Sequence, residues 1–145
     1  MTQNPTGNGP ELLEERSIGG VLVHLLALLT GIFGAGLVYL LSSHKFTKVN
    51  ARNALNWHMT LFLVTVIGFV TFFLGADTVT LAGETVAMAT ILPSPVDGIA
   101  AIMGGALLAL AGLGWFLTFF FALYATLKAI FGDAWSYPGS FNVVG

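Results

Sequence analysis

Two long apolar stretches constrain this chain more than any other feature. Residues 53–76 carry no formal charge, and residues 98–131 form a second apolar run whose only charged side chain is Lys128. At about 1.5 Å per residue, a helix over either stretch would exceed the hydrocarbon core of a bilayer, which is about 30 Å thick. Charged residues make up 8% of the chain, against about 25% in soluble domains. The composition therefore predicts an integral membrane protein.

Residues 17–41 form a further apolar segment, also long enough to span a bilayer and free of formal charge. Its middle contains Gly31, Gly34 and Gly36. Small residues let helices pack closely, and we take a straight span as the main interpretation. Alternatively, the glycines break the segment into a re-entrant turn that returns to its own side of the membrane. The predicted fold is an all-α bundle of three membrane helices, of which the first could be re-entrant.

The remaining segments are expected to flank one helical membrane domain, residues 17–132. Residues 1–16 are rich in Asn, Gly and Pro, with little to bury, and predict a disordered polar tail. Residues 133–145 form an aromatic C-terminal tail. Within the loop 77–97, residues 84–92 could form a fourth, short helix on the membrane surface.

Charge predicts the orientation in the cell membrane. The connector 42–52 contains Lys45, Lys48 and Arg52, three of the five basic residues, whereas the loop 77–97 has acidic residues and no Lys or Arg. Cytoplasmic loops carry an excess of Lys and Arg, so the connector and the C-terminus should be cytoplasmic. The N-terminus is then outside if the first segment spans, and inside if it is re-entrant. So few basic residues argue against a nucleic-acid partner.

Polar residues gather at the start of the second membrane segment. On a helix, Asn53, Asn56 and Thr60 share one face. They could anchor the chain at the membrane interface, with Arg52 near lipid phosphates and Trp57 among the headgroups. Alternatively, they form a partly buried site for a partner or substrate. The candidate polar interaction face comprises Arg52, Asn53, Asn56, Trp57, His58 and Thr60.

The start of the C-terminal tail holds a second candidate set. Gly132 is expected to end the last helix, and Trp135 and Tyr137 suit the headgroup region. Because this tail and the polar stretch are both assigned to the cytoplasmic side, they could instead pack together. The candidate tail contact comprises Lys128, Gly132, Trp135, Tyr137 and Pro138.

Two histidines lie in apolar segments, His24 and His58. A histidine pair could bind a metal or relay a proton, but these two can meet only if the first segment is re-entrant. No carboxylate lies inside a span to complete a metal site, so we expect hydrogen-bonded histidines and predict no metal and no cofactor. The chain has no cysteine and no recognisable catalytic motif, so an enzyme is not predicted.

A ladder of small residues runs along the last segment, where Ala101, Gly105 and Ala109 recur every four positions. Such ladders let helix backbones approach closely in lipid. Together with Gly31, Gly34 and Gly36, they are candidate helix-packing positions. The partner helix could belong to this chain, to a second copy, or to another membrane protein.

Two short motifs suggest a family. The stretches "NARNALNWH" (50–58) and "LKAIFGDAWSYPG" (127–139) resemble the Tic-twenty-like family of small bacterial and archaeal membrane proteins. That family is largely of unknown function and is distantly similar to a subunit of the chloroplast inner-envelope import translocon. The resemblance implies a compact helical membrane domain, and a translocation role only by distant analogy.

Three functions remain open from the sequence. The first is a non-enzymatic interaction or accessory subunit of a membrane complex, supported by the small-residue ladder and the two polar–aromatic stretches. The second is a channel, transporter or protein-translocation component with a polar path past Asn53 and Asn56. The third is a histidine-dependent membrane metal or haem protein. Expected partners are the lipid bilayer and either a second copy or another membrane protein.

Overall fold

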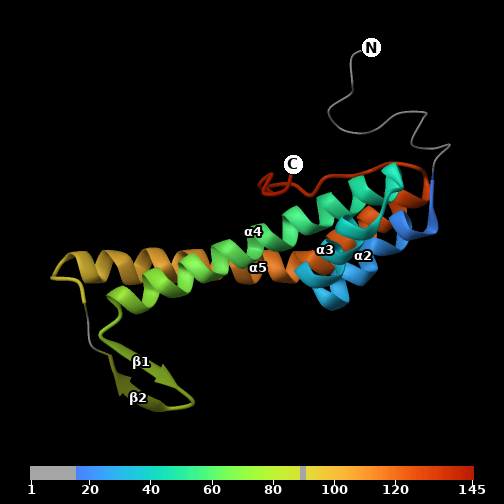
Figure 1. The fold of residues 1–145 in the computed structure, drawn as a ribbon. Coiled ribbons are helices and arrows are strands. Elements are labelled where there is room, and N and C mark those ends of the chain that lie inside the picture. The colour runs from blue at the N-terminus through green and yellow to red at the C-terminus, as the bar shows by residue number, and fades with distance from the viewer. Residues whose placement is uncertain (1–15, 89–90) are drawn as a thin grey trace. The chain divides into compact units, whose positions relative to one another are not determined.

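The computed structural model describes residues 16–88 and 91–145. Apart from Arg16, the predicted N-terminal tail lies outside the described residues. The chain divides into two compact units, one of Met1–Thr60 with Trp115–Gly145 and the other of Leu61–Gly114. Both long helices contribute to both units. The elements are α2 (Ile18–Thr30), α3 (Ile32–Leu41), α4 (Lys45–Gly75), β1 (Thr78–Leu81), β2 (Glu84–Ala87) and α5 (Val96–Ile130) (Figure 1).

The two longest helices, α4 and α5, account for two of the three predicted spans. They contain 31 and 35 residues, and both are long and apolar enough to cross a membrane. Many of their large apolar side chains are exposed, including Phe69, Phe116 and Phe119, as expected for side chains that face lipid. The predicted count of three spans is not confirmed.

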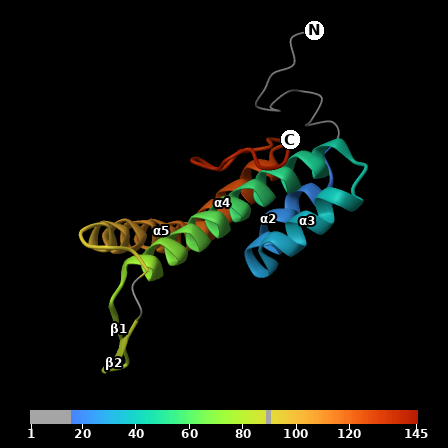
Figure 2. The same ribbon diagram turned by 60° about the vertical axis from the view of Figure 1, so that its left-hand side comes forward.

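The first apolar segment is not one straight helix. It is broken at Gly31, whose φ of 62° and ψ of −135° are conformations that glycine adopts at little cost. The helices on either side have 13 and 10 residues, so at about 1.5 Å per residue neither crosses a core of about 30 Å. They lie side by side in both views (Figures 1 and 2).

Contacts along α4 show that this segment turns back on itself. At the start of α2, the Ser17 hydroxyl is hydrogen-bonded to that of Thr47. The turn at Gly31 lies next to His58, about three helical turns further along α4. Near the end of α3, Tyr39 has returned to Lys48, whose Nζ is 5.4 Å from the ring centroid. One straight helix over residues 17–41 is therefore wrong, and the segment turns back at Gly31 as the re-entrant alternative requires. Its position in a membrane stays a prediction.

Small residues make this hairpin of helices possible. A Cβ at Gly34 would overlap with the side chain of Thr30, and one at Gly20 would overlap with the ring of Phe46. Gly36 makes only an ordinary contact with Leu55. Of the three glycines singled out in the sequence, Gly31 forms the turn and Gly34 permits the close approach of α3 to α2.

The second membrane helix begins earlier than predicted. The connector 42–52 was expected to be a polar link, but only residues 42–44 are non-helical and α4 starts at Lys45. No Gly or Pro interrupts the connector, and Phe46 and Thr47 are buried against the rest of the unit. Burial of these two side chains favours two additional helical turns over a loop.

The loop 77–97 contains a β-hairpin where a short surface helix was predicted. Strands β1 and β2 pair antiparallel, with Thr78 opposite Ala87 and Leu81 opposite Glu84. The two connecting residues, Ala82 and Gly83, have φ values of 50° and 88°, as in the tight turns that match strand twist. Consecutive β-branched residues on both sides of this turn, Thr78–Thr80 and Thr85–Val86, favour strands. The helix prediction is therefore wrong; residues 89 and 90 of it lie outside the described residues.

Within the unit Leu61–Gly114, the helices pack through glycines. A Cβ at Gly104 would overlap with the backbone of Phe72, and one at Gly75 would overlap with the backbone at Asp97 and Ala101. Of the predicted ladder, Ala101 lies at this contact, but a Cβ at Gly105 would meet nothing within 4 Å and Ala109 is exposed. The contact within the chain thus uses Gly104 and not Gly105. An oligomer face along the ladder stays a prediction.

Candidate functional site

The polar residues at the start of α4 are buried inside the protein. Asn50, Asn56 and His58 have 0%, 3% and 1% of their surface exposed, and Asn53 and Thr60 are also buried. A buried polar group without a hydrogen-bond partner is costly, so the partners of these side chains describe the site. Most of those partners lie in the C-terminal tail.

Three α4 side chains bind the backbone of the tail. Asn56 is the most heavily used: its Oδ1 accepts from the amides of Val143 and Val144 at 3.1 and 2.8 Å, and its Nδ2 donates to the Val144 carbonyl at 3.2 Å. The Thr60 hydroxyl accepts from the Phe141 amide at 2.8 Å and donates to the Asn56 carbonyl. The side chain of Asn56 thus satisfies three backbone groups of an otherwise irregular segment.

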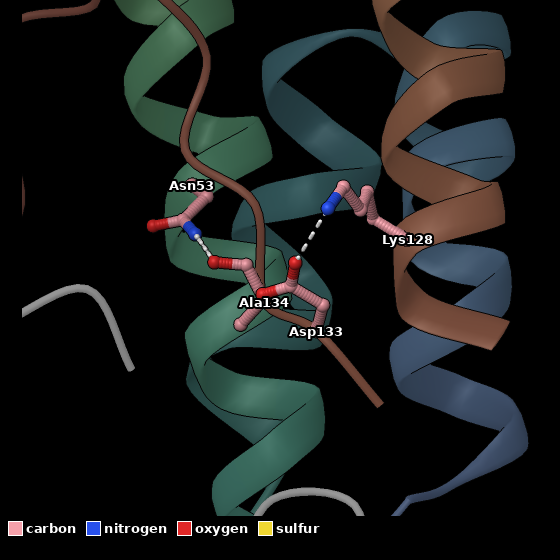
Figure 3. A network of polar contacts seen from close by, with 4 residues as sticks. All are labelled: Asn53, Lys128, Asp133 and Ala134. Atoms are coloured by element: carbon pink, nitrogen blue, oxygen red, sulfur yellow. Dashed lines mark hydrogen bonds and ion pairs between the residues drawn. The ribbon is translucent and has the colours of Figure 1, made fainter. Parts of the chain in front are cut away.

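Asn53 holds the beginning of the same tail. Its Nδ2 donates to the carbonyls of Ala134 and Trp135 at 3.2 and 3.1 Å, and Figure 3 shows the first of these bonds. The i, i+3 and i+7 spacing of Asn53, Asn56 and Thr60 places all three on one helix face. The tail therefore lies along this face from Ala134 to Val144.

The end of α5 directs the tail toward α4. Gly132 has a φ of 80°, its amide donates to the Ala129 carbonyl, and the Asp133 amide donates to the Lys128 carbonyl. These bonds form a Schellman motif, the usual glycine ending of a helix, as the sequence predicted. The Lys128 Nζ also lies 3.1 Å from Asp133 Oδ2 (Figure 3). This pair is partly exposed and adds little stability.

An aromatic cluster covers the middle of the tail. The rings of Tyr137 and Trp57 stack with centroids 5.6 Å apart, and Trp135 and Phe121 pack against Tyr137. The Trp57 Nε1 donates to the Thr118 hydroxyl at 3.0 Å. Trp57 and Tyr137 are 6% and 2% exposed, so their rings pack inside the protein, and a position at headgroup depth stays a prediction. Both find ring partners and a hydrogen bond inside the protein, which suits buried Trp and Tyr. Pro138 is exposed.

A directional chain of hydrogen bonds links the tail to α2 and α4. Asn50 Nδ2 donates to the Phe46 carbonyl at 3.0 Å, so its Oδ1 faces His24 Nε2 at 2.9 Å. An amide oxygen only accepts, so Nε2 carries the proton. Nδ1 of His24 then accepts from the Tyr137 hydroxyl at 3.0 Å. Neutral His24 thus joins three segments that are distant in sequence.

The ionisation of Tyr137 should distinguish the folded from the unfolded protein. Burial raises the pKa of the Tyr137 phenol above its usual value of about 10. Because the folded state has the higher pKa, the stabilising contribution of Tyr137 is complete below about pH 10 and is lost as the pH rises through the raised pKa. In an absorbance titration just above pH 10, native wild type and Tyr137→Phe should contain equal tyrosinate. In denaturant, the wild type should contain more tyrosinate than the variant, by the ionised fraction of one unfolded tyrosine, which is about half at this pH. The same excess in native protein would contradict the prediction.

The two apolar-segment histidines each bind a neighbouring group of the protein. The His58 Nδ1 donates to the Ala54 carbonyl at 2.9 Å, and its ring lies edge-on to Trp115. Both ring nitrogens of His24 are engaged as described above. Among residues 16–88 and 91–145, no group of three or more His, Cys, Asp or Glu side chains could hold a metal ion. The arrangement matches hydrogen-bonded, structural histidines.

Arg52 is separate from the face that binds the tail. It is half-buried and lines a pocket together with Lys48 and Tyr39. The predicted polar interaction face therefore has two parts. Asn53, Asn56 and Thr60 bind the tail, Trp57 and His58 pack inside, and Arg52 belongs to a basic pocket.

Comparison with known proteins identifies the family. A model of the magnetosome magnetite crystal formation protein family, MamF/MmsF, matches residues 15–144. The chain belongs to this family. The resemblance to the Tic-twenty-like family, which rested on two short motifs, is therefore wrong. No curated protein and no solved structure matches the chain.

The MamF/MmsF assignment and the two long apolar helices agree on the class of protein. Together they support a membrane protein. The cytoplasmic side assigned to the connector and the tail stays a prediction.

Some residues of the site were missed in the sequence. Asn50 precedes Asn53 and Trp57 at helical spacing, and that extension of the polar face could have revealed it. Thr118 could not be distinguished from other Thr residues of the last segment. The role of Phe141, Val143 and Val144 depends on backbone groups, for which side-chain patterns contain no signal.

Proposed function

We propose that this protein is a non-enzymatic accessory protein of the magnetosome membrane that influences how magnetite crystals form. The observation that supports this proposal is the MamF/MmsF match over residues 15–144, which includes every described helix and strand. The side-chain network points the same way. The polar side chains that were candidates for a chemical role hold the tail and the helices together instead. These are Asn53, Asn56 and His24.

Within this function, we assign the contact with the mineral to the loop 77–97. The side chains of Asp77 and Glu84 are exposed and lie at opposite ends of the β-hairpin, Asp77 directly before β1 and Glu84 beside the turn. The loop contains no Lys or Arg. Carboxylate oxygens are suitable ligands for hard metal cations, a class that includes iron at an oxide surface. The hairpin presents them on a short two-stranded element.

The proposal is tested in a host that forms magnetosomes, with its own copy of the gene deleted. Crystal size and shape, measured by electron microscopy, should change on deletion and be restored by the wild-type gene. The double variant Asp77→Asn/Glu84→Gln should restore them only in part. The matched control, Thr80→Val/Thr85→Val, changes the same hairpin without altering its charge and should restore them fully.

The outcomes separate the two levels of the proposal. Unchanged crystals after deletion would overturn the function itself. If deletion changes the crystals and Asp77→Asn/Glu84→Gln restores them completely, only the role of the carboxylates is overturned.

The other functions have less support. A channel path past Asn53, Asn56 and Thr60 would need these groups to face water, but they bind the backbone of the tail. Membership of a larger complex, with a second copy or another membrane protein, is part of the proposed accessory role. Chemical cross-linking in the native membrane would identify the partner.

A further inference from the structure

A basic pocket lies beside the site, at the start of α4. It has a volume of about 170 Å³ and is lined by Tyr39, Lys45, Lys48, Val49, Arg52 and Gly145. Lys45, Lys48 and Arg52 are spaced i, i+3 and i+7, so they project from one helix face. Three of the five basic residues of the chain thus line a single pocket.

The charge of this pocket is positive whatever the state of Gly145. No Asp or Glu is among its lining residues in the described part of the chain. Counting only Lys48 and Arg52, a carboxylate at Gly145 would still leave one positive charge in excess. The Tyr39 hydroxyl already donates to the carbonyl of Gly145 at 3.0 Å. Arg presents a fork of donors and Lys a mobile point charge, and both are common ligands of phosphate groups.

A second pocket, which is apolar, lies at the end of α3, the helix that contributes Tyr39 to the basic pocket. Leu37, Val38, Leu41 and Ser42 line its volume of about 270 Å³, and these residues flank Tyr39 of the basic pocket. Leu37 and Leu41 are strongly exposed, at 58% and 76%. The positive pocket and the exposed apolar side chains of α3, the helix that carries Tyr39, match the two parts of a phospholipid, a phosphate headgroup and an acyl chain.

We infer that the pocket of Lys45, Lys48 and Arg52 binds a phosphate group. The apolar surface of α3 indicates that this group is the headgroup of an anionic phospholipid. Juxtamembrane basic residues attract anionic lipids, and here the structure arranges them around one cavity. The site is independent of the acidic hairpin, which belongs to the other unit. Free phosphate has the same headgroup chemistry and is distinguished by the experiment below.

The test uses the purified full-length protein in mild detergent and native mass spectrometry. Three probes are titrated separately: phosphatidylglycerol, phosphatidylcholine and inorganic phosphate. Lys48→Gln/Arg52→Gln removes the electrostatic attraction of two basic residues for an anionic lipid. The variant should therefore weaken phosphatidylglycerol binding about 25-fold. The matched double variant Arg16→Gln/Lys128→Gln removes two charges outside the pocket and should bind like wild type. Arg52→Lys keeps the charge and should retain most of the affinity, and circular dichroism verifies that every variant folds.

Filling the apolar pocket identifies the source of the phosphate. Val38→Trp should weaken phosphatidylglycerol binding and leave binding of inorganic phosphate unchanged if the ligand is a lipid. Binding of inorganic phosphate that depends on Lys48 and Arg52, with no preference for phosphatidylglycerol over phosphatidylcholine, would support a free-phosphate site. Binding of neither anionic probe, or binding that is unaffected by the pocket double variant, would overturn the inference.

Discussion

Replacing Asn56 with leucine should detach the end of the C-terminal tail and lower the free energy of unfolding by about 2–4 kcal/mol. The Asn56 side chain makes three hydrogen bonds to Val143 and Val144, each worth about 1 kcal/mol net. Leucine fills a similar volume but removes the partner of the Val144 amide and carbonyl, and the Val143 amide keeps only its bond to the Phe141 carbonyl. The tail can then recover its hydrogen bonds only by moving into water.

Thermal unfolding of the detergent-solubilised protein would measure the loss, and limited proteolysis would report release of residues 139–145. Asn142→Leu is the matched control, because Asn142 is exposed in the same tail and should tolerate the change. If Asn56→Leu leaves both stability and protease resistance at wild-type levels, the tail is not held by this side chain.

Gly104→Ala should destabilise the unit Leu61–Gly114 by about 2 kcal/mol. The added Cβ would overlap with the backbone of Phe72, and a backbone cannot rotate away as a flexible side chain can. Overpacking of this kind usually costs about 1–3 kcal/mol and sometimes more. The effect opposes the gain of about 1 kcal/mol expected when alanine replaces glycine inside a helix.

The neighbouring glycine provides the control for this prediction. A Cβ at Gly105 would meet nothing within 4 Å, so Gly105→Ala should be neutral or stabilising by up to about 1 kcal/mol. Both variants are compared by thermal unfolding of the full chain. Equal melting temperatures for the two would show that α4 and α5 do not approach each other at Gly104.

The part of the site that could be predicted from the sequence concerns side chains at helical spacing. The periodicity of a helix places Asn53, Asn56 and Thr60 together without further information. The end of α5 at Gly132 was equally predictable, because glycine is the usual residue where a helix reverses. The functional role of these residues stays a prediction, since their position alone does not test it.

Other features could not be predicted because the local sequence is compatible with two structures, and contacts elsewhere in the protein select one of them. Residues 84–92 can be written as a helix or as part of a hairpin, and the pairing of β1 with β2 selects the hairpin. In α5, Gly104 and Gly105 differ by one residue along the helix, and only the approach of Phe72 shows which one is needed. The family was not predicted, because the two motifs at residues 50–58 and 127–139 cover only a small part of the matched residues 15–144.

By itself, the sequence determined the class of this protein, its two long apolar helices and the helical face that carries Asn53, Asn56 and Thr60. These follow from composition and from the fixed period of a helix, which need no partner. Only the tertiary structure decided that residues 17–41 turn back at Gly31, that His24 meets Asn50 and Tyr137, and that the tail lies along α4. Each of these depends on contacts between residues distant in the chain. Such contacts form, and stabilise the structure, only once the helices have packed.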